Sequence, residues 1–144
     1  MKKYNGAIAI LYKRNDGKIN FLLNENKKNG NFTLISGAKE EFDKSLEDTA
    51  IREIKEELNL NPTDYILIPT AVKHEFIFGP NKPEREGQKG SYSVFLADVT
   101  DYSGKITHKE ENRQVVWMIK SEATKKISFD DLREVFKKAC EKIE

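Results

Sequence analysis

The chain has few of the features that mark a secreted or membrane protein. Its single cysteine, Cys140, cannot form a disulfide within the chain, and without a His or Asn constellation around it we interpret it as a helix residue rather than a nucleophile. The apolar run 7–11 is too short for a signal peptide or a membrane span, and Lys13 and Arg14 follow it directly. The formal net charge is only +1, so no global field attracts nucleic acid or an anionic membrane. These absences predict a cytoplasmic protein.

The chain also lacks repeats and linkers, which predicts one domain over residues 1–144. This length is sufficient to bury a real core. Capping residues predict helices from Ser45 to Asn59 and from Ser128 onward, and Asn15-Asp16-Gly17 predicts a hairpin turn. Apolar or alternating segments predict strands over 6–12, 19–23, 32–35, 65–72, 73–78, 91–99 and 113–119. We therefore expect an α/β or α+β sandwich, with helices on both faces of a mixed sheet.

Three carboxylates lie close together in the first predicted helix. Glu53, Glu56 and Glu57 fall at i, i+3 and i+4, a spacing that puts all three on one helix face, about 5–6 Å apart at Cβ. Such like charges destabilise a bare helix, and a hard divalent cation among them reverses that effect. On a helical wheel Glu57 falls inside the apolar arc, where a merely solvating glutamate is not expected. A solvated face with pairs such as Arg52 and Glu56 explains the spacing alone equally well.

The segment that contains this helix, residues 37–60, resembles the Nudix box. In that family a Gly is followed by five residues, a Glu, seven residues, Arg-Glu, an aliphatic, any residue, Glu-Glu, any residue, Gly and an aliphatic. The positions that match are Arg52, Glu53, Ile54, Glu56, Glu57 and Leu60. Three positions depart, because Ala38 replaces the first Gly, Lys44 the first Glu and Asn59 the last Gly. Asp43 supplies the missing acid only if the loop is shifted by one residue, with Gly37 as the box Gly.

The resemblance implies a Nudix-like α/β/α sandwich and an enzyme that hydrolyses phosphoanhydrides with Mg²⁺ or Mn²⁺. It implies that Glu56, Glu57 and the carbonyl of Gly37 are metal ligands, and that Glu53 is a ligand, a proton acceptor or both. Arg52 is expected to orient Glu53 and Glu56 through ion pairs. Lys44 is expected to point to solvent, so that Lys44→Glu has little effect on activity.

A second acidic residue, Glu111, is predicted as a ligand or general base. It lies six residues before Trp117, a spacing similar to the late Glu region of enzymes that cleave dinucleoside polyphosphates. Glu111 also forms an acidic pair with Glu110, and such pairs commonly only face solvent. The resemblance therefore favours a dinucleoside polyphosphate or a nucleoside triphosphate as substrate.

Candidate substrate-binding residues are basic or aromatic. The 79–90 loop is the expected specificity element, because long loops in small domains are often functional. His74 is interpreted as either a packed strand residue or a groove residue. Phosphate contacts are predicted for Lys39, Lys82, Arg85 and Lys89, and base stacking for Phe76, Phe78 and Tyr92, although Phe76 and Phe78 equally fit a core.

Three alternatives compete with a small-nucleotide hydrolase. One is an enzyme that removes pyrophosphate from an RNA 5′ end, which the near-neutral charge disfavours. Another is a catalytically weak Nudix domain that binds a nucleotide or regulates, for which Ala38 and Lys44 argue. The third is an unrelated α+β domain. A homodimer is compatible with the resemblance, since Nudix proteins are often dimers.

Overall fold

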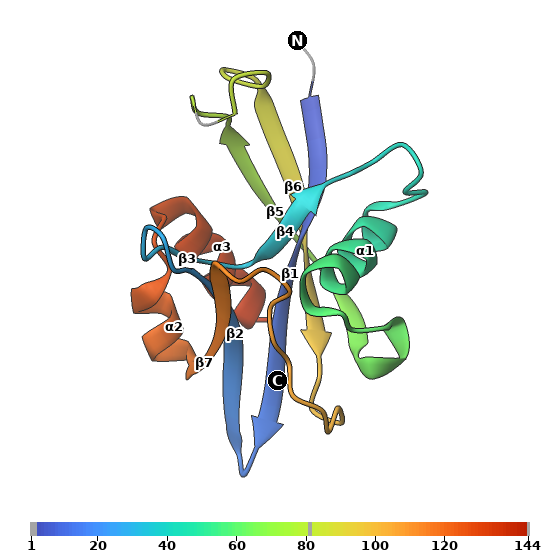
Figure 1. The fold of residues 1–144 in the computed structure, drawn as a ribbon, viewed down its shortest axis with the longest axis vertical. Helices are drawn as coiled ribbons and strands as arrows, with labels where there is room; N and C mark the ends of the chain where they lie inside the picture. The colour runs from blue at the N-terminus through green and yellow to red at the C-terminus, as the bar shows by residue number, and fades with distance from the viewer. Residues whose placement is uncertain (1–2, 81, 144) are drawn as a thin grey trace.

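The computed structural model describes residues 3–80 and 82–143, so Asn81 of the predicted 79–90 loop lies outside the described residues. The elements in chain order are β1 (Lys3–Asn15), β2 (Lys18–Asn26), β3 (Phe32–Thr33), β4 (Ile35–Ala38), α1 (Leu46–Leu58), the 3₁₀ turn η1 (Pro62–Asp64), β5 (Ile66–Ile77), β6 (Lys89–Asp98), β7 (Arg113–Ile119), α2 (Lys120–Lys126) and α3 (Asp130–Cys140). Figure 1 shows α1 on one side of the strands and α2 with α3 on the other.

The seven strands form one mixed sheet in which β1 is central. Residues 3–12 of β1 pair in parallel with β6, and β6 is antiparallel to β5. The other edge of β1 is shared, because residues 12–15 pair with β2 whereas residues 6–9 pair with β4. Beyond the hairpin, residues 24–25 of β2 pair with β3, and residues 20–26 pair with β7. The strands β1 and β2 therefore diverge, and β3 and β4 cross the gap between them (Figure 1).

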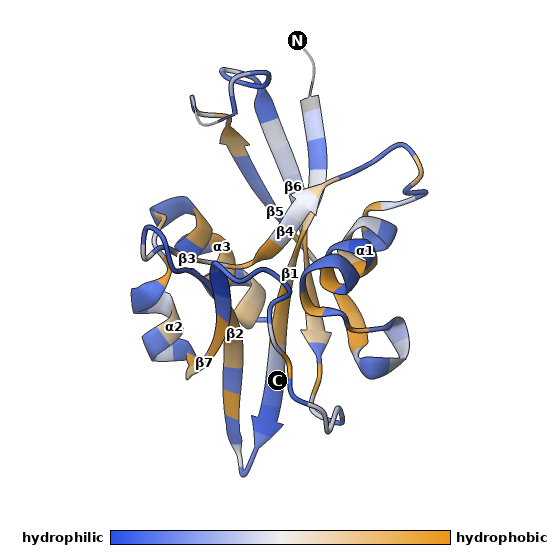
Figure 2. Cartoon of the chain, viewed as in Figure 1, coloured by the Kyte–Doolittle hydropathy of each residue, from blue (hydrophilic) through white to orange (hydrophobic). Residues whose placement is uncertain are grey.

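The alternating side chains of β1 pack into the hydrophobic core on each face of the sheet. Ile8, Ile10 and Tyr12 pack with α2 and α3 on one face, and Ala9 and Leu11 pack with α1 on the other. Figure 2 shows that the hydrophobic colour follows the central strands, while the connecting loops are mostly hydrophilic. The predicted sandwich, a mixed sheet with helices on both faces, is confirmed.

The boundaries of α1 agree with the capping signals in the sequence. The Ser45 hydroxyl accepts a hydrogen bond from the Asp48 N–H at 3.1 Å, and Asn59 adopts the left-handed conformation with φ 58°. Asn59 therefore ends the helix in place of the box glycine, and the three carboxylates of α1 are held on a helix of defined start and end.

Other boundaries differ from those predicted. The two strands predicted over 65–78 are one strand, β5, with a bulge at which Ala71 takes φ 66°. The Ser128 hydroxyl does not cap α3, which has Phe129 at its N-cap, and instead accepts a hydrogen bond from Phe32 N–H. Helix α2 was not predicted, because seven residues with one buried side chain give no periodic signal. Within the described ranges, no helix combines the length and apolar character needed to cross a membrane.

Candidate active site

A cleft of about 690 Å³ opens where β1 and β2 diverge. Its floor comes from four strands, with Ile8 of β1, Asn24 of β2, Thr33 of β3 and Ser36 of β4. One wall is α1, which presents Glu53, Glu56 and Glu57. The opening between the strands thus places the predicted metal-binding carboxylates at the side of a cavity of ligand size.

Gly37 and Glu53 occupy adjacent space. A Cβ added to Gly37 would overlap the carboxyl group of Glu53, so no side chain fits between β4 and α1 at this position. Gly37 also pairs with Ala7 in the sheet. Gly37, and not Ala38, is therefore the residue that must be a glycine for Glu53 to pack here.

The variant Gly37→Ala is expected to push the Glu53 carboxyl out of position. We expect the free energy of unfolding to fall by about 1–3 kcal/mol and the catalytic rate to fall at least about tenfold, because a small misplacement of a catalytic group is costly. The control is Ala38→Gly, which adds the glycine of the unshifted alignment and should change neither quantity much. Chemical denaturation and initial rates measure both. An unchanged rate in Gly37→Ala would contradict this packing role.

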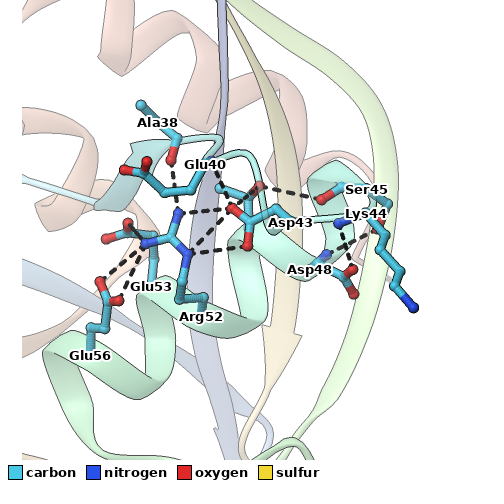
Figure 3. A network of polar contacts seen from close by, with 10 residues as sticks. Ala38, Glu40, Asp43, Lys44, Ser45, Asp48, Arg52, Glu53 and Glu56 are labelled. Carbon is cyan, nitrogen blue, oxygen red and sulfur yellow. Dashed lines mark hydrogen bonds and ion pairs between the residues drawn. The ribbon is translucent and has the colours of Figure 1, made fainter.

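Arg52 is the centre of a polar network that fixes the acidic residues (Figure 3). Its Nη1 donates to Glu53 Oε2 at 3.0 Å and to Glu56 Oε1 at 3.2 Å. Its Nη2 donates to the Ala38 carbonyl at 2.8 Å and to Asp43 Oδ2 at 2.9 Å. The guanidinium therefore ties α1 to the loop before it and holds two of the three clustered carboxylates, as the sequence predicted for Arg52.

Asp43 is the acid that the box alignment lacked at position 44. Its side chain is 3% exposed and accepts hydrogen bonds from Arg52, Thr49 and the Glu40 N–H. The hydrogen bond from Arg52 lowers the pKa of Asp43 to about 2. Figure 3 shows the Lys44 side chain pointing away from Arg52. The loop is thus shifted by one residue, with Gly37 and Asp43 in the places of the box Gly and Glu.

Glu53 and Glu57 share a partly buried environment. Burial, together with a hydrogen bond and the charge of Glu53, raises the pKa of Glu57 to about 8. Burial also raises the pKa of Glu53, while the hydrogen bond with Glu57 and the charge of Arg52 lower it. Two carboxylates held this close share a proton unless a cation neutralises them. The pair therefore favours the binding of a cation.

His108, which the sequence analysis did not single out, contacts Glu57. Its side chain is 1% exposed, and its Nε2 lies 3.2 Å from Glu57 Oε1. Its Nδ1 accepts the Glu110 N–H at 3.0 Å, so the hydrogen of the neutral ring lies on Nε2 and is donated to Glu57. Burial lowers the pKa of His108, which favours the neutral form. His108 therefore orients one carboxylate oxygen of Glu57.

The loop that carries His108 also determines which late acidic residue reaches the cleft. Glu110 lines the cleft beside Arg113, whose Nε lies 3.1 Å from Glu110 Oε2. Glu111 is exposed and is not among the described residues that line the cleft. The structure therefore gives Glu110, and not the predicted Glu111, the position closer to the carboxylates of α1.

The predicted substrate-binding residues separate into two groups. Phe76, Tyr92, His74 and Lys82 line the cleft. Lys39 and Arg85 line a separate groove beside Tyr4, and Lys89 lines a depression with Glu75 and Ile77. Arg85 also lies over the rings of Tyr4 and Phe78, at 4.8 and 5.5 Å from their centroids. The structure does not bring Lys39, Arg85 and Lys89 into the cleft.

Two further features of the cleft involve its polar side chains. His74 stacks on Phe76 with ring centroids 4.8 Å apart, and its Nε2 lies 2.8 Å from Asp131 Oδ2. Asn24 is 3% exposed, and its Oδ1 is buried without a hydrogen-bond partner among the described residues. A buried unpaired carbonyl is costly, and a ligand donor in the cleft satisfies it. Asn24 is therefore a candidate for reading a polar edge of the ligand.

The donor set fits a hard divalent cation. Glu53, Glu56 and Glu57 line the cleft with carboxylate oxygens, the ligands that such an ion prefers, whereas Gly37 packs against Glu53 and is not among the described residues that line the cleft. Within residues 3–80 and 82–143, no three His, Cys, Asp or Glu side chains are already arranged around one metal position, and Arg52 holds Glu53 and Glu56. Glu56 lines the cleft while its carboxylate pairs with Arg52, so an ion bound there would compete with Arg52 for this carboxylate.

Comparisons with known proteins agree with this geometry. The chain matches the family model described as the NUDIX domain over residues 3–139. Among solved structures, it is similar to an Ap4A hydrolase of C. elegans, with a TM-score of 0.75, 20% identity, and 94% of this chain and 93% of that chain covered. It is also similar to the dihydroneopterin triphosphate pyrophosphohydrolase of E. coli, with a TM-score of 0.74, 16% identity and 92% of each chain covered.

A third similar structure is the NUDIX domain of NrtR from Shewanella oneidensis, solved with ADP ribose. Its TM-score is 0.75 at 16% identity, with 100% of this chain and 90% of that chain covered. No curated protein matches the chain. Since the family model spans nearly all of the sequence, the chain belongs to the NUDIX family and has the fold of the Nudix hydrolases.

Proposed function

We propose that this protein hydrolyses a phosphoanhydride bond, with Mg²⁺ or Mn²⁺, in a nucleoside diphosphate linked to another group. The observation that carries the proposal is the pairing of Glu53 and Glu57 in a ligand-sized cleft, where burial raises the pKa of both. A dinucleoside polyphosphate or a nucleoside triphosphate is the favoured substrate. The Ap4A hydrolase and the dihydroneopterin triphosphate pyrophosphohydrolase of the same fold support that choice.

The residues of α1 divide the chemistry between them. When bound, a divalent ion neutralises phosphate oxygens and lowers the pKa of a water molecule. Glu56, Glu57 and the Gly37 carbonyl hold the ion in this proposal. Glu53 accepts the proton of the attacking water, a role that suits its raised pKa. Arg52 orients Glu53 through the bond to its Oε2 and does not itself contact substrate.

The opposite side of the cleft binds the nucleoside. Phe76 and Tyr92 provide aromatic surface, which stacks any base with modest energy. Asn24 accepts a hydrogen bond from the base or ribose through its unpaired Oδ1. Of the cationic side chains predicted to contact phosphate, Lys82 lies in the cleft. The substrate thus lies with its phosphates toward α1 and its nucleoside toward β5 and β6.

A substrate panel tests the proposal. Purified protein is incubated with Mg²⁺ and a nucleoside triphosphate, a diadenosine polyphosphate, ADP-ribose or 5′-triphosphorylated RNA, and the products are identified. We expect the dinucleotide or the triphosphate to be hydrolysed with Mg²⁺, and we expect no hydrolysis in EDTA. Turnover of the RNA alone would favour an enzyme that removes pyrophosphate from an RNA 5′ end. Binding without turnover of every member would contradict a hydrolase and favour a ligand-binding domain.

The carboxylate pair predicts an unusual pH dependence of stability. Because the pKa of Glu57 is raised from 4.5 to about 8, its protonated form is favoured in the folded state. Its contribution to stability is complete below about pH 4.5 and is lost as the pH rises through about 8. Without divalent ions, Tm is therefore expected to fall across this window, and Mg²⁺ should raise Tm more at pH 8 than at pH 5.

Thermal unfolding with and without Mg²⁺ measures this effect, and Glu57→Gln is the matched control. The variant cannot titrate at this position, so its Tm should depend less on pH and on Mg²⁺. The same increase in Tm from Mg²⁺ at both pH values in the wild type would contradict the linkage of ion binding to Glu57.

A further inference from the structure

A second cleft of about 500 Å³ lies next to the first, behind the loop that carries His108. His108 and Arg113 line both clefts, so one loop separates them. The floor of the second cleft is apolar, with Val99, Ile106 and Val115. The proposed hydrolysis uses none of the residues that line only this second cleft.

The charge of the second cleft has one sign. Lys13, Lys105 and Arg113 line it, and no Asp or Glu is present among its described lining residues. Arg113 is paired with Glu110, whereas Lys13 and Lys105 have no carboxylate partner in the described part of the chain. The chain has 25 Lys and Arg residues and 24 Asp and Glu residues, so composition alone does not explain a cleft whose charged lining residues are all Lys or Arg. This cleft is complementary to an anion.

An aromatic surface adjoins these cations. Trp117 lines the cleft, and the ammonium of Lys13 lies 4.1 Å from the centroid of its ring. Tyr102 lines the cleft as well. Lys13 can leave the ring for a phosphate, and a base can then stack on the indole in its place. Cations beside an indole thus suit a ligand that combines a phosphate with a planar base.

We propose that the second cleft binds a nucleoside phosphate, with its base on Trp117 and its phosphate between Lys13 and Lys105. Two sources of this ligand share the same chemistry. One is the far end of a dinucleotide whose other end is hydrolysed in the first cleft, and this source rests on the proposed function. The other is a separate mononucleotide, which does not depend on it.

The chain contains one tryptophan, so intrinsic fluorescence reports directly on this cleft. The wild-type protein is titrated with AMP in EDTA and excited at the red edge of the indole absorption, where adenine absorbs little. We expect saturable quenching. In Lys105→Glu, a change at an exposed residue, we expect AMP to bind about tenfold more weakly, because a charged contact is lost.

Phe76→Ala is the matched control, since Phe76 lines the first cleft and not the second. Quenching by AMP should be unchanged in this variant. Absence of saturable quenching up to millimolar AMP, or equal quenching in Lys105→Glu, would overturn the proposal. Quenching that Phe76→Ala abolishes would overturn it too, by placing the nucleotide in the first cleft. This measurement needs no turnover, so it fails or succeeds independently of the hydrolase proposal.

Two further titrations distinguish the sources. If the far end of the substrate binds, diadenosine tetraphosphate in EDTA should quench at lower concentration than AMP. Lys105→Glu should then raise the KM for that dinucleotide and leave the KM for ATP unchanged. If a separate mononucleotide binds, AMP should quench as effectively as the dinucleotide, and Lys105→Glu should change neither KM. Either pattern supports a nucleoside phosphate in the second cleft.

Discussion

The variant Glu57→Gln is expected to lose hydrolytic activity by a factor on the order of 10³ in kcat/KM. Glu57 lies on the wall of the first cleft, its carboxyl pairs with that of Glu53, and burial raises its pKa to about 8. Replacing one carboxylate with an amide removes the charge that a divalent ion needs. The expected loss is measured as initial rates in saturating Mg²⁺ on the best substrate of the panel.

The fold should survive this change. Gln has the size of Glu, and its amide oxygen still accepts the hydrogen bond that His108 donates to Glu57 Oε1. Equal far-ultraviolet circular dichroism of the variant and the wild type therefore serves as the control for folding. Near wild-type turnover in a folded Glu57→Gln protein would contradict the proposed role of the α1 carboxylates.

The same assay separates the two late acidic residues. Glu111→Gln is expected to leave the rate within about twofold of the wild type, because changes at exposed surface positions usually have small effects. Glu110→Gln removes a cleft-lining carboxylate that pairs with Arg113, so a larger loss is expected. The reverse order would restore Glu111 as the distal catalytic residue.

The second large effect is expected for Asp43→Asn. This change removes the charge that faces Arg52 at 2.9 Å in a side chain that is 3% exposed. We expect the free energy of unfolding to fall by about 2–3 kcal/mol, because the partly buried Arg52 loses the most buried of its carboxylate partners. Activity should fall as well, since Arg52 positions Glu53 and Glu56. Urea denaturation and initial rates measure the two effects.

The pair of Asp43 and Arg52 also predicts an acid transition. The pKa of Asp43 is lowered from 3.8 to about 2, so the stability from this pair is complete above about pH 4 and is lost as the pH falls through about 2. Asp43→Asn should therefore flatten the dependence of stability on pH in that range.

Lys44→Glu is the matched control for Asp43→Asn, because it restores the acid of the unshifted alignment at an exposed position. We expect little change in stability or rate, and no rescue when it is combined with Asp43→Asn. Rescue in the double variant would contradict the one-residue shift of the loop, because it would show that position 44 can pair with Arg52.

Local signals were sufficient to predict α1 and its carboxylate face. The Ser45 and Asn59 caps define the helix within a residue at each end, and the spacing of Glu53, Glu56 and Glu57 depends only on helical geometry. The β1–β2 turn at Asp16 and Gly17, both with positive φ, was predicted for the same reason. Features that neighbouring residues determine can thus be read from one sequence.

Features that depend on distant contacts were not predicted. His108 reaches Glu57 across 51 residues of chain, and its position depends on how the loop before β7 folds back onto α1. The choice between Glu110 and Glu111 depends on the same loop. His108 stands two residues before the acidic pair Glu110 and Glu111, but the sequence does not show that its side chain is buried.

The basic residues show the same limit. Lys39, Arg85 and Lys89 were predicted as phosphate ligands from charge and proximity along the chain, yet they lie outside the first cleft. Charge alone does not indicate the direction of a side chain. The structure instead places Lys13 and Lys105 in a second cleft, although they lie far from the box in sequence.

In the proposed function, the carboxylate face of α1 is a divalent-metal site. It is tested most directly by titrating wild-type protein and Glu57→Gln with Mn²⁺ and following free Mn²⁺ by electron paramagnetic resonance at pH 8. We expect saturable binding to the wild type that is weakened at least about tenfold in the variant. Equal binding to both proteins, or none to the wild type even with nucleotide present, would contradict it.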